Sequence, residues 1–185
     1  MDLHSTGNGG VGMKQDFAQQ INNTIHDVMR EIHTAMPGKI LSYSDGMVSV
    51  RPSLRFKTPK GEFLQYPVIA NVPIVVPHGG NASIAVPINA GDDCLIIISE
   101  QAIGEWLSGA EDDTQLRFDL TNAICIPGLC RTVLEAQEEA NATDSVVIAS
   151  GGNKIRVSNE SVAVWGDVKV EGNLTCTGVI KGSNI

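Results

Sequence analysis

Residues 162–183 read VAVWGD, VKVEGN, LTCTGV and IKGS, four segments that repeat with a period of six. The first position is always aliphatic, and in the first three segments the third position is apolar and the fifth is glycine. Such alternation predicts short strands with one buried face, and the glycines predict bends between them. The predicted buried positions are Val162, Val164, Val168, Val170, Leu174, Cys176 and Ile180, and the predicted bends are Gly166, Gly172 and Gly178.

A strand and a bend every six residues are typical of β-solenoids and β-prisms. In a single-chain hexapeptide solenoid one coil uses about three repeats, and several stacked coils are needed before a core is buried. The repeats seen here could close little more than one coil. We therefore expect three copies of the chain to wind into a triangular prism, in which each chain covers the strand edges of the next. The alternative is an ordinary meander of short hairpins.

The composition is that of a folded, acidic protein. The 185 residues are 42% hydrophobic and 18% charged, with a formal net charge of −8. Because nucleic-acid-binding surfaces normally carry a basic patch, nucleic acid is not an expected partner. The sequence has neither a run long enough for a transmembrane helix nor the features of a signal peptide, so we expect synthesis in a reducing cytosol. The cysteines lack metal-type spacing and are predicted to be buried free thiols; they are Cys94, Cys125, Cys130 and Cys176.

The N-terminal part predicts a flexible end followed by one amphipathic helix. Residues 1–12 are rich in glycine, and residues 13–36 carry apolar side chains at helical spacing before Pro37-Gly38, the expected stop. This stripe predicts packing either on the helix's own domain or against symmetry mates or an adapter protein. His26 and His33 lie on the same helix but lack further ligands, so no metal is expected there. The stripe consists of Phe17, Ile21, Ile25, Val28 and Ile32.

The following segment, residues 38–130, predicts an all-β domain. Strand-like runs alternate with turn signals such as Ser44-Asp45-Gly46. Five to six strands in about ninety residues suit a small Greek-key barrel of the oligonucleotide/oligosaccharide-binding (OB) type. The runs are 39–43, 47–52, 54–57, 63–76, 83–86 and 93–98, followed by a short helix or flap at 103–109, an acidic loop at 110–115 and a final apolar segment at 117–126.

The predicted fold class is all-β, with an N-terminal α-helix, an OB-like Greek-key barrel and an intertwined trimeric β-helix needle. The corresponding ranges are 1–37 for the flexible end and helix, 38–130 for the barrel, 131–144 for a linker or short helix, and 145–185 for the spike. Within the last range, residues 145–157 predict a hairpin that leads into the repeats.

Several motifs, taken in order, resemble a known family. Gly91-Asp92-x-Cys94-Leu95 leads to Trp106, and Arg117-x-Asp119-Leu120-Thr121-Asn122-Ala123 and Pro127-Gly128-Leu129 follow. This order, with the glycine repeats after it, is similar to the central-spike proteins of bacteriophage baseplates, the membrane-puncturing tips of contractile tails. The positions that carry the resemblance in the barrel are Gly91, Asp92, Trp106, Arg117, Asp119, Pro127 and Gly128.

The resemblance implies a structural protein of the virion. It would be made in the host cytoplasm, assemble as a homotrimer, and sit at the baseplate tip on a trimeric hub protein of the tail. Tail contraction would then drive the needle mechanically through the host outer membrane.

The predicted tip departs from the pattern of that family. Spikes of this family often end in a His-x-His pair from each chain that holds iron on the axis, whereas no histidine follows His78 here. Lysine and asparagine cannot replace those ligands, since an ammonium has no lone pair to donate. We therefore expect no metal or other cofactor. The predicted tip consists of Ile180, Lys181, Asn184 and Ile185, closed by the two isoleucines.

No catalytic site is expected. His78-Gly79-Gly80 has no accompanying Gly-x-Ser-x-Gly motif, and the acidic groups at 92–93 and 111–113 lie where turns and surface loops place acids anyway. Two alternatives to a puncturing spike are an OB-type module that binds oligosaccharide or nucleic acid and is trimerised by a prism, and a hexapeptide-repeat acyltransferase. The acyltransferase would need more coils and a suitably placed histidine.

Overall fold

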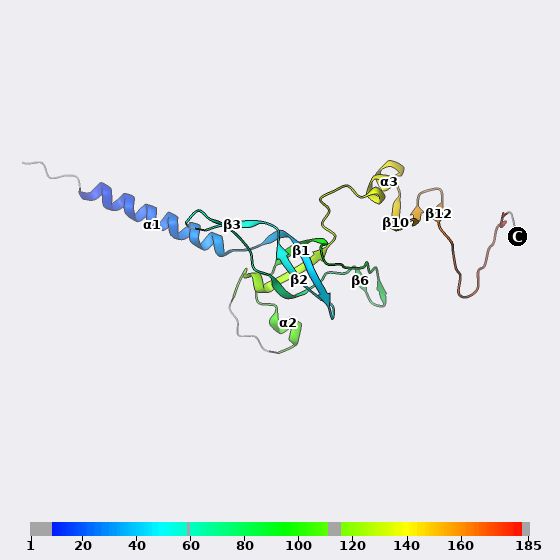
Figure 1. The fold of residues 1–185 in the computed structure, drawn as a ribbon, viewed down its shortest axis with the longest axis horizontal. Helices are drawn as coiled ribbons and strands as arrows, with labels where there is room; N and C mark the ends of the chain where they lie inside the picture. The colour runs from blue at the N-terminus through cyan, green and yellow to red at the C-terminus, as the bar shows by residue number, and fades with distance from the viewer. Residues whose placement is uncertain (1–8, 59, 111–115, 183–185) are drawn as a thin grey trace, which may run out of the picture. The chain divides into compact units, whose positions relative to one another are not determined.

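The computed structural model describes residues 9–58, 60–110 and 116–182. The chain divides into two compact units, Met1–Arg131 and Thr132–Ile185, which are described separately. Figure 1 shows the order of their elements, which are mostly strands. Within the described ranges, no helix combines the length and the apolar character needed to cross a membrane.

Helix α1 comprises Gly9–Glu31 and carries the predicted apolar stripe except for Ile32, which follows its last residue. It includes residues 9–12, which were expected to be a flexible end; the rest of that predicted end, residues 1–8, lies outside the described residues. The helix also ends earlier than expected, because Pro37-Gly38 lies inside strand β1 (Ala35–Ser44). Pairing with another strand decides this boundary: the Ile98 N–H donates to the Thr34 carbonyl at 2.7 Å and draws the chain into a sheet.

A five-stranded antiparallel sheet dominates the first unit, in the order β5–β2–β1–β8–β9. Strands β1 and β2 are joined at Asp45 and Gly46, whose φ angles of 52° and 81° suit a tight hairpin turn. The two edges of the sheet meet where Ile74 forms a parallel bridge with Cys125. The sheet therefore curls until its edge strands touch. The further bounds are β2 (Met47–Pro52), β5 (Ile69–Pro73), β8 (Asp93–Ile98) and β9 (Ala123–Pro127).

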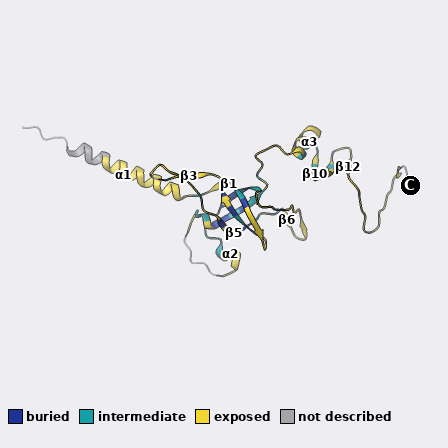
Figure 2. Ribbon diagram, viewed as in Figure 1, coloured by how far each residue is buried: buried dark blue, intermediate teal, exposed yellow. Residues whose placement is uncertain are grey.

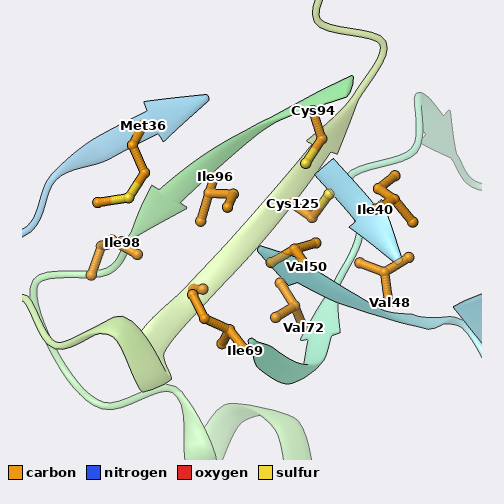
Figure 3. Close-up of a cluster of buried hydrophobic side chains, with 11 residues drawn as sticks. Met36, Ile40, Val48, Val50, Ile69, Val72, Cys94, Ile96, Ile98 and Cys125 are labelled. Atoms are coloured by element: carbon orange, nitrogen blue, oxygen red, sulfur yellow. The ribbon is translucent and has the colours of Figure 1, made fainter. Parts of the chain in front are cut away.

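The hydrophobic core lies inside this curled sheet and is aliphatic (Figure 3). Ile96 of β8 is fully buried, and Gly38 of β1 packs against it so closely that an added Cβ would lie 2.9 Å from Ile96 Cγ1. Cys94 and Cys125 come from neighbouring strands and are both buried free thiols, as predicted. Their hydrogen bond, together with burial, raises the pKa of the Cys125 thiol. The buried hydrophobic residues are Met36, Ile40, Val48, Val50, Ile69, Val72, Cys94, Ile96, Ile98, Ala123 and Cys125.

The prediction that all four cysteines are buried is wrong for Cys130, which is exposed at the end of the first unit. Cys176 is also exposed in the single chain. Its predicted burial was between chains, in the trimer, which a single chain does not test.

Smaller elements complete the first unit. Two short hairpins are formed by β3 (Arg55–Lys57) with β4 (Phe63–Gln65) and by β6 (His78–Gly79) with β7 (Ala82–Ser83), so the strand predicted at 83–86 is wrong beyond its first residue. Helix α2 (Gly104–Ser108) confirms the helix predicted there. The acidic loop at 110–115 lies, apart from its first residue, outside the described residues.

The final strand of the first unit is shorter than the predicted run 117–126. It is preceded by a single 3₁₀ turn, η1 (Leu120–Asn122). The Asp119 carboxylate accepts hydrogen bonds from the Thr121 N–H at 2.9 Å and from the Thr121 hydroxyl at 2.6 Å. Such local side-chain bonds offer the backbone an alternative to the extended ladder. They also favour the ionised carboxylate and lower the pKa of Asp119.

The second unit consists of a helix and a three-stranded antiparallel sheet, in the order β10–β11–β12. The hairpin predicted within residues 145–157 is confirmed, and the first glycine repeat adds a third strand to it. The elements are α3 (Glu135–Thr143), β10 (Val146–Ser150), β11 (Asn153–Val157) and β12 (Val162–Trp165). Residues 166–182 are described but form no strand within the chain.

Candidate functional site

One face of the three-stranded sheet carries six partly exposed aliphatic side chains, with the polar pair Ser150 and Asn153 at its end. In the central strand, Val157 pairs with Val146 and Val162, and Ile155 pairs with Ile148 and Val164. Because neighbouring residues across an antiparallel ladder point to the same side, these pairs form two adjacent apolar rows. Their exposed fractions lie between 41% and 65%. We call this surface the aliphatic face; its members are Val146, Ile148, Ile155, Val157, Val162 and Val164.

The opposite face of the same sheet is already covered within the chain. Lys154 Nζ lies 2.6 Å from Glu139 Oε2 of α3, and Arg156 Nη1 lies 3.5 Å from Glu139 Oε1. The Trp165 ring stacks on both cations, with Lys154 Nζ at 4.3 Å and Arg156 Cζ at 5.0 Å from its centroid. This side is therefore the polar side of the sheet.

The aliphatic face is large enough to need a partner. Six half-exposed aliphatic side chains present roughly 400–500 Å² of apolar surface, which is comparable with the largest such patches on monomeric proteins. A sheet with one bare apolar face is normally completed by packing against another apolar layer. The geometry is thus suited to association through this face.

The segment that follows the sheet also lacks partners for its backbone. Across the described residues 166–182, no hydrogen bond joins two main-chain groups of the chain. Buried or assembled backbone groups are almost always paired, so such a segment is either hydrated or paired with another chain. The predicted axis positions in it are all exposed: Val168, Val170, Leu174, Cys176 and Ile180.

Two of the three predicted bends require glycine. Gly166 and Gly172 have φ angles of 114° and 138°, in the region that side-chain-bearing residues avoid. At Gly166 an added Cβ would also lie 2.9 Å from Cγ of Asn153. Gly178 has no positive φ. Of the predicted tip, Asn184 and Ile185 lie outside the described residues, whereas Ile180 and Lys181 are exposed.

The residues that carry the family resemblance stabilise turns in the first unit. The Gly91 N–H donates to the Ile40 carbonyl at 2.8 Å, and Asp92 Oδ2 accepts from the Asn89 N–H at 2.7 Å. The Gly128 N–H donates to the Asp93 carbonyl at 3.1 Å, immediately after Pro127 at the end of β9. Gly91 thus ties its turn to β1 and Gly128 ties its turn to β8, whereas Asp92 bonds within its own turn.

The other resemblance positions lie at the surface. Arg117 forms an exposed ion pair with Glu100, and Asp119 caps the η1 turn. Trp106 of α2 is 73% exposed. The structure therefore does not bring these residues together into one pocket.

The groups considered as catalytic candidates are engaged elsewhere. His78 Nδ1 lies 2.8 Å from the Val76 carbonyl oxygen. Asp93 forms ion pairs with Lys39 at 3.0 Å and Arg131 at 2.7 Å, and these hydrogen bonds hold the pKa of its carboxyl below the ordinary value. Residues 111–113 lie outside the described residues. In the part of the chain that the structure describes, no three His, Cys, Asp or Glu side chains gather as a metal site.

Sequence reasoning missed the polar cluster that covers the polar side of the sheet. The alternation of Lys154 and Arg156 with Ile155 and Val157 was a signal for one polar and one apolar face. That the carboxylate partner would be Glu139, fifteen residues before Lys154, could not be inferred from a local pattern.

Comparison with known proteins relates the first unit to phage proteins. Residues 36–128, half of the chain, match the family model described as "Phage protein Gp138 N-terminal domain". The matched segment contains nearly all of the five-stranded sheet. No curated protein matches the chain. The match supports a structural protein of a phage as the general role, and the chain belongs to the family of the phage protein Gp138 N-terminal domain.

Proposed function

We propose that this protein is the trimeric central spike of a phage tail baseplate and that tail contraction drives it through the host outer membrane. The observation that carries the proposal is the aliphatic face followed by a repeat segment without main-chain partners. Both features belong to the same stretch of chain. If identical chains associated there, the aliphatic face would be covered and the main chain of the repeat segment would gain hydrogen-bond partners.

Three copies would place their aliphatic faces toward a shared axis. Val162 and Val164 lie on this face, whereas Trp165 lies on the polar side with Lys154. Residues 166–182 of each chain would then continue as short strands that pair with the neighbouring chains, with a bend at each glycine. Such an intertwined prism leaves no open strand edge.

A spike of this kind suits mechanical penetration. The side chains that alternate with the axis positions are mostly polar or charged: Asp167, Lys169, Glu171, Asn173, Thr175 and Thr177. A charged outer surface does not partition into hydrocarbon, so passage through a membrane requires external force. Because every backbone group in the prism is paired between chains, the structure presents no edge at which it could unravel in lipid.

The first unit is proposed to be an OB-type barrel that attaches the spike to a trimeric hub protein of the tail. The sheet order β5–β2–β1–β8–β9, with the parallel bridge of Ile74 to Cys125 across its edges, supports this barrel type. The proposed role is structural, without a catalytic step or a cofactor, and its place is the tip of the tail in the virion.

The function can be tested in the phage that encodes the protein. Substitution of Val164 with aspartate should leave tails that assemble and contract but fail to deliver the genome, because the spike no longer forms. The matched variant Ala163→Asp places the same charge one residue earlier, on the polar side of β12 next to Arg156, and should infect normally. Normal plating of the Val164→Asp phage would contradict the proposal.

A further inference from the structure

The apolar stripe of α1 is uncovered in the folded chain. Of the two expectations for this helix, packing on its own domain does not occur, because the stripe residues remain between 46% and 65% exposed. Figure 2 colours residues 16–31 of the helix as exposed. The stripe consists of Phe17, Ile21, Ile25, Val28 and Ile32.

Four of these residues, together with Ala18, have the spacing of a coiled coil, whereas Phe17 falls at a flanking g position. Ala18, Ile25 and Ile32 are seven residues apart, and Ile21 and Val28 fall between them at steps of three and four. In the heptad notation abcdefg, the first set occupies a and the second occupies d. This period of 3.5 is the one that keeps a narrow seam facing a partner helix. The outward f positions are Asn23 and Arg30, both polar.

The residue types at the seam favour three strands. Isoleucine at both a and d shifts parallel coiled coils from dimers toward trimers and tetramers. Here isoleucine occupies the d position at 21 and the a position at 25, and the next a position falls on Ile32, the first residue after α1. The flanking e and g positions between residues 22 and 31 are Asn22, Thr24, Met29 and Glu31, with a single charge among them. A partner of complementary charge is therefore not indicated, whereas identical helices can approach without a repulsive row.

We propose that α1 self-associates with two further copies of this chain as a parallel three-stranded coiled coil. The inference rests on the proposed function, which supplies the trimer, and extends it to the N-terminal helix. At about 100 Å² for each of five or six side chains, each helix would bury roughly 500–600 Å² of mostly apolar surface against the other two. Association would also stabilise the helix itself, because most helical stability in proteins comes from packing of the apolar face rather than from intrinsic propensity.

Cross-linking of the full-length chain tests the coiled coil directly. In a background with Cys130→Ser and Cys176→Ala, which removes the two exposed thiols, Ile25→Cys places a cysteine at an a position and Asn23→Cys places one at an f position. A short bismaleimide should join chains through Cys at position 25 about tenfold faster than at position 23, since only a positions face each other. The native mass of each variant is measured in the same samples.

The outcomes separate the coiled coil from the spike. A trimeric mass with equal cross-linking at both positions would overturn the coiled coil and leave the proposed function standing. A monomeric mass in the unsubstituted chain would overturn both. In case Ile25→Cys disturbs the helix, the pair Val28→Cys (d position) and Arg30→Cys (f position) repeats the comparison, and equal rates there would again overturn the coiled coil.

Discussion

Replacing Val164 with aspartate should separate the C-terminal segments of the trimer while leaving each chain folded. Val164 is 48% exposed in the single chain and pairs with Ile155 in the sheet, so the aspartate carboxylate that replaces it remains hydrated when the chain is alone. In the proposed trimer the same side chain faces the axis with two copies of itself. The substitution therefore acts on the assembly and hardly on the fold.

The magnitude follows from burying three carboxylates together. The effective desolvation penalty is several kcal/mol per ion, and losing the burial of each valine adds about 1 kcal/mol. For three chains the total exceeds roughly 10 kcal/mol, which is comparable with the entire free energy of a nanomolar complex, about 12 kcal/mol. The variant segment should thus be unassembled at micromolar concentration.

The assay should report on this segment, because the N-terminal helices could still hold the chains together. Lys169 and Lys181 are accessible to trypsin in a single chain, and Lys169 is highly exposed there. The unsubstituted protein should resist cleavage at both sites, whereas Val164→Asp should be cut rapidly. The matched control Ala163→Asp should resist, since its carboxylate lies on the polar side beside Arg156.

Acidic pH should partly restore the assembly of the Val164→Asp variant. A carboxyl that is buried only in the assembled state has a raised pKa there, so its neutral form favours the trimer, and assembly is lost as pH rises through that value. Protection from an acid-active protease at pH 4 should therefore return for Val164→Asp and not for Val164→Lys. Equal protection of Val164→Asp, Ala163→Asp and the unsubstituted chain at pH 7 would refute the assignment of the aliphatic face to the axis.

Three further predictions concern the stability of each unit. Ile96→Ala should lower the free energy of unfolding by about 2–5 kcal/mol, measured with denaturant, because Ile96 is fully buried. Ile97→Ala, on the exposed side of β8, should lower it by less than about 1 kcal/mol. Equal losses for the two variants would contradict the described core. Asp93→Asn should lower the denaturation midpoint at pH 7 but not at pH 2–3. The pKa of this carboxyl is lowered in the folded chain, so the carboxylate stabilises the fold above about pH 3.8, and that stabilisation is lost as pH falls through the folded pKa. A difference in midpoint that does not depend on pH would contradict this. Glu139→Gln should destabilise the second unit by about 1 kcal/mol, measured by urea unfolding followed through tryptophan fluorescence. An unchanged midpoint would mean that the ion pairs of Glu139 with Lys154 and Arg156 do not stabilise this unit.

Local signals predicted the elements whose boundaries are set locally. The Asp45-Gly46 turn and the hairpin within residues 145–157 were predictable because turn residues and alternation lie in the same short window. The end of α1 was not, since Pro37-Gly38 is a helix stop in isolation but sits in β1 once β8 pairs with it. The ladder to a strand some sixty residues away overrides the local preference.

In the candidate site, too, local sequence predicted some features, whereas others depend on strand pairing over a longer range. The repeat pattern placed Val162 and Val164 on one side and Trp165 on the other, because period-two alternation fixes the side of a strand. It did not predict that β12 would join β10 and β11, which extends the aliphatic face to six residues. That extension depends on strand register, which requires the folded chain.

The native mass of the full-length chain, measured by sedimentation equilibrium at low micromolar concentration, tests the central claim most directly. Three chains of 19.6 kDa predict a single species of about 59 kDa that persists on dilution. A species of 19.6 kDa would contradict the trimer and the puncturing role that depends on it.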